Sequence, residues 1–281
     1  MSSKRAPRGE VVPIRIAALP MYDFPELRDA NDRLWDAMAR RLREGGITGV
    51  PQQLTRGLSH REVWGHPGLL FGQACEYPLS KSFRSRLRIV ATPRYGAPGC
   101  AVNTYRSAIV VRAGGSAGFL EDLRGRRCVV NEPDSNSGMN LLRAALAPIC
   151  GGARFFQSVS VSGSHRRSVE LIAAGAADVA AVDCVTLEHL RRFHPQLIAQ
   201  VRVVDWTPPS PCLPFVVSRR TSETTVQAVC SALEGVCADP ALASVREALL
   251  LEGVDLTPDV TFGRVLELEQ LAERWRYPEL L

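Results

Sequence analysis

Three strand-then-helix units follow one another in the middle of this chain and constrain its fold more than any other feature. They occupy residues 127–149, 155–174 and 179–193, and in each a short apolar run precedes a segment with helical spacing of apolar residues. Repeated alternation of this kind predicts mainly parallel strands with helices on both faces of the sheet. The sequence therefore predicts an α/β protein, and its 281 residues suit two lobes or one large domain.

Segments on either side of these units complete the predicted fold. We expect further strands at residues 11–19, 68–74, 87–92, 107–112, 201–204 and 215–218, and helices at 25–44, 226–238, 241–251 and 262–274. Between the last two of these strands lie Pro208, Pro209, Pro211 and Pro214. We interpret this proline-rich passage as a crossover between two lobes.

The segment 129–138 runs from a buried strand through a polar loop and directly into a helix expected from residue 139. Ser135, Asn136 and Ser137 sit where the first-turn amides of a helix have no partner within it. Amides, hydroxyls and the positive end of the helix dipole together suit an oxyanion. The alternative, which the residue types alone favour, is that Ser and Asn simply cap the helix.

Three loops leave strands at the same predicted edge of the sheet, at 131–138, 162–165 and 183–185. In open α/β sheets, ligands bind beyond the carboxyl ends of the strands. Two of the three loops also lead into the amino termini of helices. We therefore expect these loops to converge on a single site for a small anion.

The overall composition excludes several other classes of protein. With 46% hydrophobic and 22% charged residues the chain is typical of a soluble globular protein. Its net charge is +5, and Lys4 and Lys81 are its only lysines, so the other basic residues are arginines. Because these arginines are scattered along the sequence, we expect no nucleic-acid partner. The eight cysteines show no CxxC pair or zinc-type spacing. We predict free thiols, no metal and no cofactor, with a disulfide left open for an exported protein.

The amino terminus carries no recognisable export signal. Residues 1–10 are polar and basic, and the apolar run that follows is short and interrupted by Arg15 and Pro20. No stretch is long enough to cross a membrane, so we expect no membrane insertion. As written, the sequence predicts a cytoplasmic protein.

Several motifs, in their order along the chain, resemble those of the phosphate/phosphite/phosphonate-binding proteins of ABC transporters. The resemblance covers nearly the whole chain. Its motifs are Gly72-Gln73-Ala74-Cys75-Glu76-Tyr77-Pro78-Leu79, Asp122-Leu123-Arg124-Gly125-Arg126-Arg127, Asp134-Ser135-Asn136-Ser137-Gly138, Ser162-Gly163-Ser164-His165, the run from Gly175 to Asp183, and Leu213-Pro214-Phe215.

The resemblance implies a type II periplasmic-binding-protein fold, in which two α/β lobes joined by two crossover strands close on a ligand. Residues 11–105 with 207–281 would form the first lobe, and 106–206 the second, which carries the Ser-Asn-Ser-Gly loop. It also implies a small anionic ligand such as a phosphonate or phosphate, an ABC transporter permease as partner, a periplasmic location and a monomer.

The resemblance transfers binding roles to particular residues. The family's Ser-x-Ser-Gly turn implies that Ser135, Asn136, Ser137 and Gly138 bind the oxyanion. Further transfers fall on Ser164, His165, Asp183 and Tyr105. From their position after strands of the other lobe, Tyr22 and Glu76 are candidates for its wall, with ordinary loop packing as the alternative. Surface exposure is the alternative for His165, and helix capping for Asp183.

Two other functions stay open on the same fold, because function resides in the site rather than in the architecture. One is a cytosolic enzyme, with His165, Asp183, Glu76 or a cysteine in acid–base or nucleophilic roles. The other is a sensor that reports ligand occupancy to a separate protein. No spacing pairs a nucleophile with a base, so we predict a solute-binding protein without catalytic residues.

Overall fold

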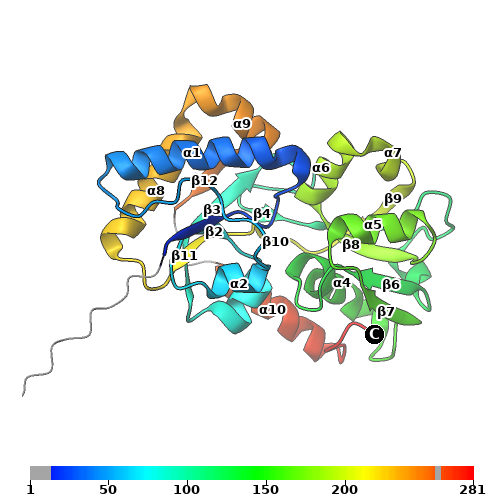
Figure 1. Cartoon of the computed structure of the whole chain (residues 1–281). Coiled ribbons are helices and arrows are strands. Elements are labelled where there is room, and N and C mark those ends of the chain that lie inside the picture. Colours follow the sequence, from blue (N-terminus) through cyan, green and yellow to red (C-terminus); the bar gives the residue numbers. More distant parts are fainter. Residues whose placement is uncertain (1–13, 257–260) are drawn as a thin grey trace, which may run out of the picture.

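The computed structural model describes residues 14–256 and 261–281 and has two lobes side by side (Figure 1). The sheet of the first lobe has the strand order β1-β2-β11-β3-β12. These strands are β1 Ile16–Ala18, β2 Leu69–Gln73, β11 Phe215–Ser218, β3 Leu87–Tyr95 and β12 Leu251–Asp255. The predicted α/β class is confirmed, and residues 11–13 of the first predicted strand lie outside the described residues.

The sheet of the second lobe has the order β7-β6-β8-β5-β9. Its strands are β7 Ser158–Val161, β6 Arg127–Val130, β8 Val179–Asp183, β5 Ser107–Arg112 and β9 Val201–Trp206. Buried side chains such as Val129, Val182 and Val110 fill its centre, which is why the central strands β6, β8 and β5 read as apolar runs.

Both sheets are mixed, which corrects the prediction of mainly parallel strands. Strands β6, β7 and β8 run parallel, as do β1 and β2, whereas β5 and β11 are antiparallel to their neighbours. The reason lies in the crossovers. Both β5 and β11 arrive from the other lobe, so each enters its sheet at the edge where the strands of the βα units end.

Helices cover both faces of each sheet. On the first lobe these are α1 Arg28–Glu44 after the short η1 Pro25–Leu27, α2 His60–Gly65, α3 Glu76–Pro78 with η2 Leu79–Phe83, α8 Glu223–Ala238, and α9 Ala243–Ala248 after η5 Pro240–Leu242. Helix α1 buries Leu34, Met38 and Leu42, spaced for one helical face, against the sheet. Ser59 caps α2 by accepting from the Glu62 amide at 3.3 Å.

The second lobe has the same layered construction. Its helices are η3 Leu120–Leu123, η4 Asn136–Asn140 with α4 Leu141–Cys150, α5 His165–Ala173, α6 Cys184–Phe193, α7 Pro195–Ile198 and α10 Thr261–Arg274. One apolar cluster joins α4 and α10 to one face of the sheet, and another joins α5 and α6 to the opposite face. Each βα unit therefore buries its helix against its own sheet.

A small two-stranded sheet connects the lobes (Figure 1). Strand β4, Thr104–Tyr105, pairs antiparallel with β10, Ser210–Pro211. The second of these strands lies in the proline-rich passage that the sequence marked as a crossover. Among the described residues, no single helix is long and apolar enough to cross a bilayer, and α8 reaches that only together with 240–248, across a bend of 75°.

The carboxyl-terminal segment departs from the predicted division of the chain. The prediction assigned all of 207–281 to the first lobe, yet Ala272, Tyr277 and Leu280 belong to an apolar cluster of the second lobe. The amide of Phe155 also donates to the carbonyl of the terminal Leu281 at 2.7 Å. The tail therefore packs against the second lobe, and α10 lies between the lobes, in contact with α4 of the second and with α3 and η2 of the first.

The predicted helix 241–251 also needs correction. Helix α9 ends at Ala248, and Leu250 has a left-handed backbone conformation with φ of 57°. Because such a residue cannot continue a right-handed helix, the chain turns there and forms β12 along β3. Because residues 249–251 are all leucine, no sequence signal marked the change from helix to strand there.

Candidate ligand-binding site

A cavity of about 540 Å³ lies between the lobes, with walls from both. The three loops predicted to converge all line it, at the carboxyl ends of β6, β7 and β8. The first lobe contributes the loop after β1, part of α2 and residues just beyond β2. The lining residues are Pro20, Met21, Tyr22, Asp23, Phe24, Pro25, Ser59, His60, Arg61, Trp64, Cys75, Pro78, Asn131, Glu132, Asp134, Ser135, Ser137, Gly163, Ser164, His165, Arg166, Asp183, Thr186 and Leu213.

Two helix starts meet on one wall of this cavity. The Ser135 hydroxyl caps η4 by accepting from the Gly138 amide at 3.0 Å. The Ser164 hydroxyl caps α5 by accepting from the Arg167 amide at 3.1 Å. Between them the Ser137 hydroxyl and His165 Nε2 are 2.8 Å apart. Hydroxyls, an imidazole and the positive ends of two helices are thus gathered at one place.

His165 is neutral at physiological pH. Burial lowers the pKa of this imidazole to about 4, against a smaller opposing effect of the Ala181 backbone carbonyl. A neutral imidazole has one N–H donor and one acceptor nitrogen, so it can donate to an anion or accept from the Ser137 hydroxyl. The anion attraction of this wall therefore comes from hydrogen-bond donors and helix dipoles rather than from a histidine charge.

Gly138 allows close packing in this wall because it has no side chain. A Cβ added there would lie 1.9 Å from Asn131 Oδ1 and 3.3 Å from His165 Cε1. Only glycine lets both side chains approach the start of the helix. Asn131, which follows β6 directly, thereby reaches the cavity, and within the described structure its buried Oδ1 has no hydrogen-bond partner.

Asp183 and Tyr22 join the two lobes across the cavity. The Tyr22 hydroxyl donates to Asp183 Oδ2 at 3.1 Å, while Asp183 Oδ1 accepts from the Thr186 amide at 2.7 Å and so caps α6. Burial raises the pKa of Asp183 to about 6. Asp183 therefore caps α6, as the alternative interpretation expected, and also lines the cavity.

Four predicted site residues lie outside the cavity lining: Asn136, Gly138, Tyr105 and Glu76. Asn136 is fully buried and donates to the Tyr105 hydroxyl at 3.1 Å and the Ser210 hydroxyl at 2.9 Å. It therefore ties the start of η4 to both crossover strands. Its neighbours Ser135 and Ser137 face the cavity, because successive residues in a helical turn point in different directions.

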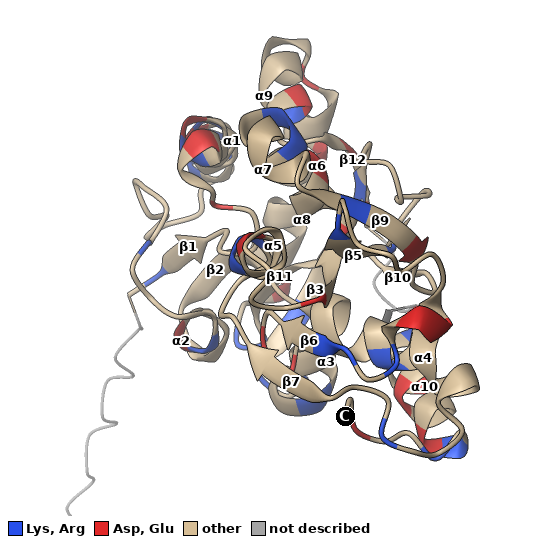
Figure 2. Cartoon of the chain, turned by 90° about the vertical axis from the view of Figure 1, so that its right-hand side faces the viewer, with Lys and Arg blue, Asp and Glu red and all other residues tan. Residues whose placement is uncertain are grey.

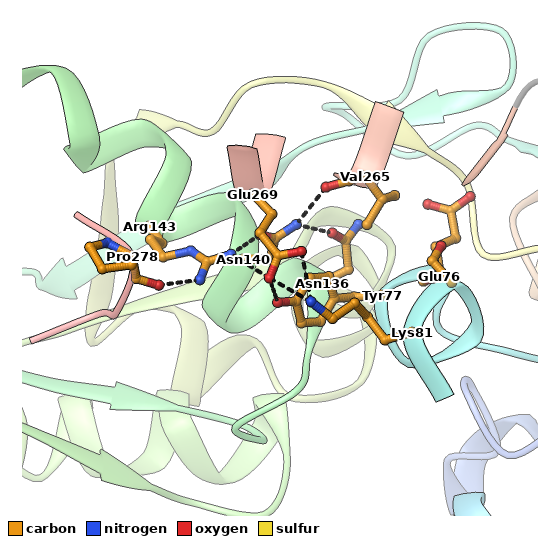
Figure 3. Close-up of polar contacts among 10 residues, drawn as sticks. Glu76, Tyr77, Lys81, Asn136, Asn140, Arg143, Val265, Glu269 and Pro278 are labelled. Atoms are coloured by element: carbon orange, nitrogen blue, oxygen red, sulfur yellow. Dashed lines mark hydrogen bonds and ion pairs between the residues drawn. The ribbon is translucent and has the colours of Figure 1, made fainter. Parts of the chain in front are cut away.

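Glu76 lies on the same side as Asn136 and accepts a long hydrogen bond of 3.4 Å from Ser210. Burial raises the pKa of this carboxyl well above its usual value and so favours its uncharged form. In Figure 3, Glu76 stands apart from the polar network that contains Asn136 and Asn140. Its predicted place in the wall of the first lobe is taken by the neighbouring Cys75 and Pro78.

The cavity also has a charged rim that sequence reasoning missed. Arg61 on α2 forms an ion pair with Asp134 of the second lobe, and Arg166 pairs with Glu170 at 3.2 Å. Only the tertiary structure brings α2 to this position, so no local pattern could reveal Arg61. In the view of Figure 2, acidic and basic segments are scattered over the face rather than gathered into a basic stripe.

Comparison with known proteins identifies the family. A sequence model of the family described as "ABC transporter, phosphonate, periplasmic substrate-binding protein" matches residues 71–258. No curated protein matches the sequence at a significant level. The match spans more than half of the chain and includes all three loops of the second-lobe wall.

Solved structures agree in fold. A binding protein component of an ABC phosphonate transporter from Pseudomonas aeruginosa has a TM-score of 0.72 at 16% identity, over 93% of this chain and 87% of that one. PhnD1 from Prochlorococcus marinus, solved with methylphosphonate, has a TM-score of 0.69 at 13% identity, over 93% and 98%. A Xanthomonas citri protein solved with a chloride ion has a TM-score of 0.70 at 17% identity, over 93% and 98%.

Identities this low establish the shared two-lobed fold alone, and the predicted periplasmic-binding-protein architecture is thereby confirmed. The family itself rests on the sequence match, and its members are binding components of transporters rather than enzymes. The chain belongs to the family of periplasmic substrate-binding proteins of phosphonate ABC transporters.

Proposed function

We propose that this protein binds an organophosphonate in the cavity between its lobes and presents it to an ABC transporter permease. The contact between the Ser137 hydroxyl and His165 Nε2, at the meeting point of two helix starts, is the observation that supports this most. A tetrahedral oxyanion needs several donors at fixed positions, and helix amino termini provide them. Ser135, Ser137, Ser164 and His165 would bind the phosphonate oxygens.

The remainder of the cavity favours a ligand with an organic substituent over bare phosphate. Its volume of about 540 Å³ exceeds what a single tetrahedral ion fills, and Phe24, Trp64 and Leu213 give it an apolar side. Asp183 and Tyr22 would contact the end of the ligand remote from the phosphonate. Above pH 6, a charged Asp183 would favour a substituent carrying an amine.

The family supports the partner and the location. Its members work with an ABC transporter and are periplasmic. We extend both properties to this chain, and we propose that it acts as a monomer. The two-lobed fold provides the hinge closure by which such proteins enclose a ligand.

Ligand-induced stabilisation tests this function. The melting temperature of the purified protein should rise with methylphosphonate and 2-aminoethylphosphonate and rise less with phosphate, because a ligand that binds the folded state stabilises it. Sulfate serves as an anion control. If none of the phosphonates shifts the melting temperature more than sulfate does, the assignment is wrong.

The Ser137–His165 contact also suggests the enzyme alternative, since a hydroxyl beside an imidazole is the beginning of a nucleophile–base pair. Within the described residues the buried His165 Nδ1 has no hydrogen-bond partner, whereas a hydrolase would place a carboxylate there to orient the histidine. Phosphorus NMR of protein incubated with 2-aminoethylphosphonate decides between the two. We expect an unchanged ligand, and turnover would favour the enzyme.

A further inference from the structure

Three cysteines from distant parts of the sequence meet beside the hinge. Cys100 lies in the loop between β3 and β4, Cys184 is the first residue of α6, and Cys212 follows β10. The sulfur atoms of Cys100 and Cys184 are 3.4 Å apart, which is van der Waals contact. Cys212, on the opposite crossover, is close enough to affect the pKa of the Cys100 thiol.

The close approach of Cys100 to Cys184 is built into the backbone. Gly99 has φ of 103°, and a Cβ added there would lie 2.9 Å from Cys184 Cβ and 2.6 Å from the Trp206 ring. Any other residue would push the loop away from α6. The amide of Arg106 donates to the Gly99 carbonyl at 3.0 Å and closes the loop.

The thiols of this cluster differ in reactivity. Cys100 is half-buried, whereas Cys184 and Cys212 are buried. The Cys184 side chain and then the Cys212 side chain lower the pKa of the Cys100 thiol, while the pKa of Cys184 is raised. Since the thiolate is the nucleophilic form and Cys100 is the more exposed of the two, Cys100 is the reactive member of the pair. By contrast, burial raises the pKa of Cys75 in the cavity wall to about 12.

A metal site fits this cluster less well. Across residues 14–256 and 261–281, no group of three or more His, Cys, Asp or Glu side chains has an arrangement suited to a metal ion. Two cysteine sulfurs in van der Waals contact are instead the arrangement from which a disulfide forms.

We propose that Cys100 and Cys184 form a reversible disulfide that fixes the hinge when the protein meets a hydroperoxide. The Cys100 thiolate attacks one peroxide oxygen, the O–O bond breaks, and Cys100 becomes a sulfenic acid as hydroxide leaves. The sulfur of Cys184 then attacks Cys100, the S–O bond breaks, and the departing hydroxide takes the Cys184 proton to form water. The two sulfurs lose two electrons in total, and the peroxide gains them.

Such a bond would join the two lobes directly. The Cys100 loop is anchored to the first lobe, where the Gly96 amide donates to the Leu250 carbonyl at 2.9 Å. Cys184 belongs to the second lobe and follows Asp183 on the cavity wall. The disulfide would therefore restrain relative motion of the lobes at a point next to the ligand.

Peptide mapping by mass spectrometry tests the proposal on the full chain. After treatment with hydrogen peroxide, we expect a cross-linked peptide pair containing Cys100 and Cys184, lighter by two hydrogens and cleaved by a reductant. The variant Cys100→Ser should lose the cross-link, and Cys230→Ser, a half-buried cysteine on α8, serves as the matched control. Because this readout needs no ligand, it is independent of the proposed phosphonate binding.

A second variant provides a test if Cys100→Ser does not fold. Cys212→Ala leaves both partners in place but removes the thiol that helps to lower the pKa of Cys100, so the cross-link should form several-fold more slowly at neutral pH. The proposal is overturned if the folded wild type, treated with peroxide, carries Cys100 as a thiol, a sulfinic acid or a sulfonic acid without any bond to Cys184. It is equally overturned if Cys212→Ala reacts at the wild-type rate.

Discussion

The two lobes are joined sparsely on the cavity side and densely on the side of α10. Across the cavity, single contacts such as that between Tyr22 and Asp183 link the lobes around open space. On the other side, Glu269 of α10 accepts hydrogen bonds from Tyr77 and Lys81 of the first lobe (Figure 3). The same carboxylate lies 3.8 Å from the Arg143 guanidinium on α4 of the second lobe.

The difference indicates which side of the molecule moves. Buried, multiply bonded groups cost much free energy to separate, because each group left unpaired keeps its desolvation penalty. Asn136, Tyr105 and Ser210 add a second such network at the crossover strands. We infer that the α10 side acts as the pivot, whereas the cavity side opens and closes around the ligand.

Gly138→Ala should have the largest effect on the cavity side. The added methyl group would collide with Asn131 Oδ1, so the helix start and the His165 wall must separate. We expect a loss of stability of about 1 to 3 kcal/mol, as for other overpacked sites, together with loss of measurable phosphonate binding. Urea unfolding and calorimetric titration measure the two effects.

Gly114→Ala is the matched control, because no heavy atom lies within 4 Å of a Cβ added there. It should leave binding unchanged. Equal losses of binding in both variants would show that the Gly138 wall has no special part in the site.

Asp183→Asn tests whether the buried Asp183 carboxyl makes the stability of the protein depend on pH. The folded pKa of about 6 lies above the usual value of about 3.9, so the folded state holds this proton more tightly than the unfolded chain. This contribution to stability is present below about pH 4 and is lost as the pH rises through 6. Asp183→Asn has no carboxyl group to titrate at this position. Its free energy of unfolding, relative to that of the wild type, should therefore rise by about 2 to 3 kcal/mol between pH 4 and pH 7.

Urea unfolding at several pH values checks this expectation, with the exposed Asp36→Asn as the control. Parallel stability curves for the wild type and Asp183→Asn across this range would contradict the account.

Ser137→Ala should weaken phosphonate binding with little effect on folding. Loss of one hydrogen bond to a charged ligand costs about 1.5 to 3 kcal/mol, which is roughly a 10- to 100-fold loss of affinity. Ser158→Ala, at the exposed start of β7, is the matched control. Calorimetric titration with methylphosphonate decides, and an affinity within twofold of the wild type would remove Ser137 from the site.

Glu269→Gln should have the smallest effect, on stability alone. Burial opposes ionisation, yet hydrogen bonds from Tyr77 and Lys81 lower the pKa of Glu269 below its usual value. This contribution is present above the unfolded pKa and is lost as the pH falls, the reverse of Asp183. We expect about 1 kcal/mol of destabilisation at pH 7 that diminishes toward pH 4, with ligand affinity retained.

The exposed Glu267→Gln, on the same helix, is the matched control for the α10 side. If Glu269→Gln lost more free energy of ligand binding than free energy of unfolding, the separate roles inferred for the two sides would be contradicted.

Much of the fold could be predicted because its central strands are buried on both faces. The observed bounds of β5 and β11 equal the predicted ones, since each is a short apolar run rich in valine or isoleucine. The short helix α2 and strand β12 escaped prediction. Six residues give little periodic signal, and β12 begins within an apolar run that also suits a helix.

The candidate site was predictable where the βα rule applies and not elsewhere. Loops after parallel strands meet at one edge of a sheet, which is why Ser137, His165 and Asp183 lie together. The sequence could not tell that Asn136 faces the crossovers while its neighbours face the cavity. Nor could it place Arg61, whose position depends on how the two lobes meet.

A crystal structure of the protein with methylphosphonate tests the central claim most directly. We predict phosphonate oxygens about 3 Å from the Ser137 hydroxyl and from His165 Nε2, with the first-turn amides of η4 and α5 directed at the ligand. The account is contradicted if the anion binds away from these two helix starts, or if the cavity stays closed around the protein's own side chains at saturating ligand.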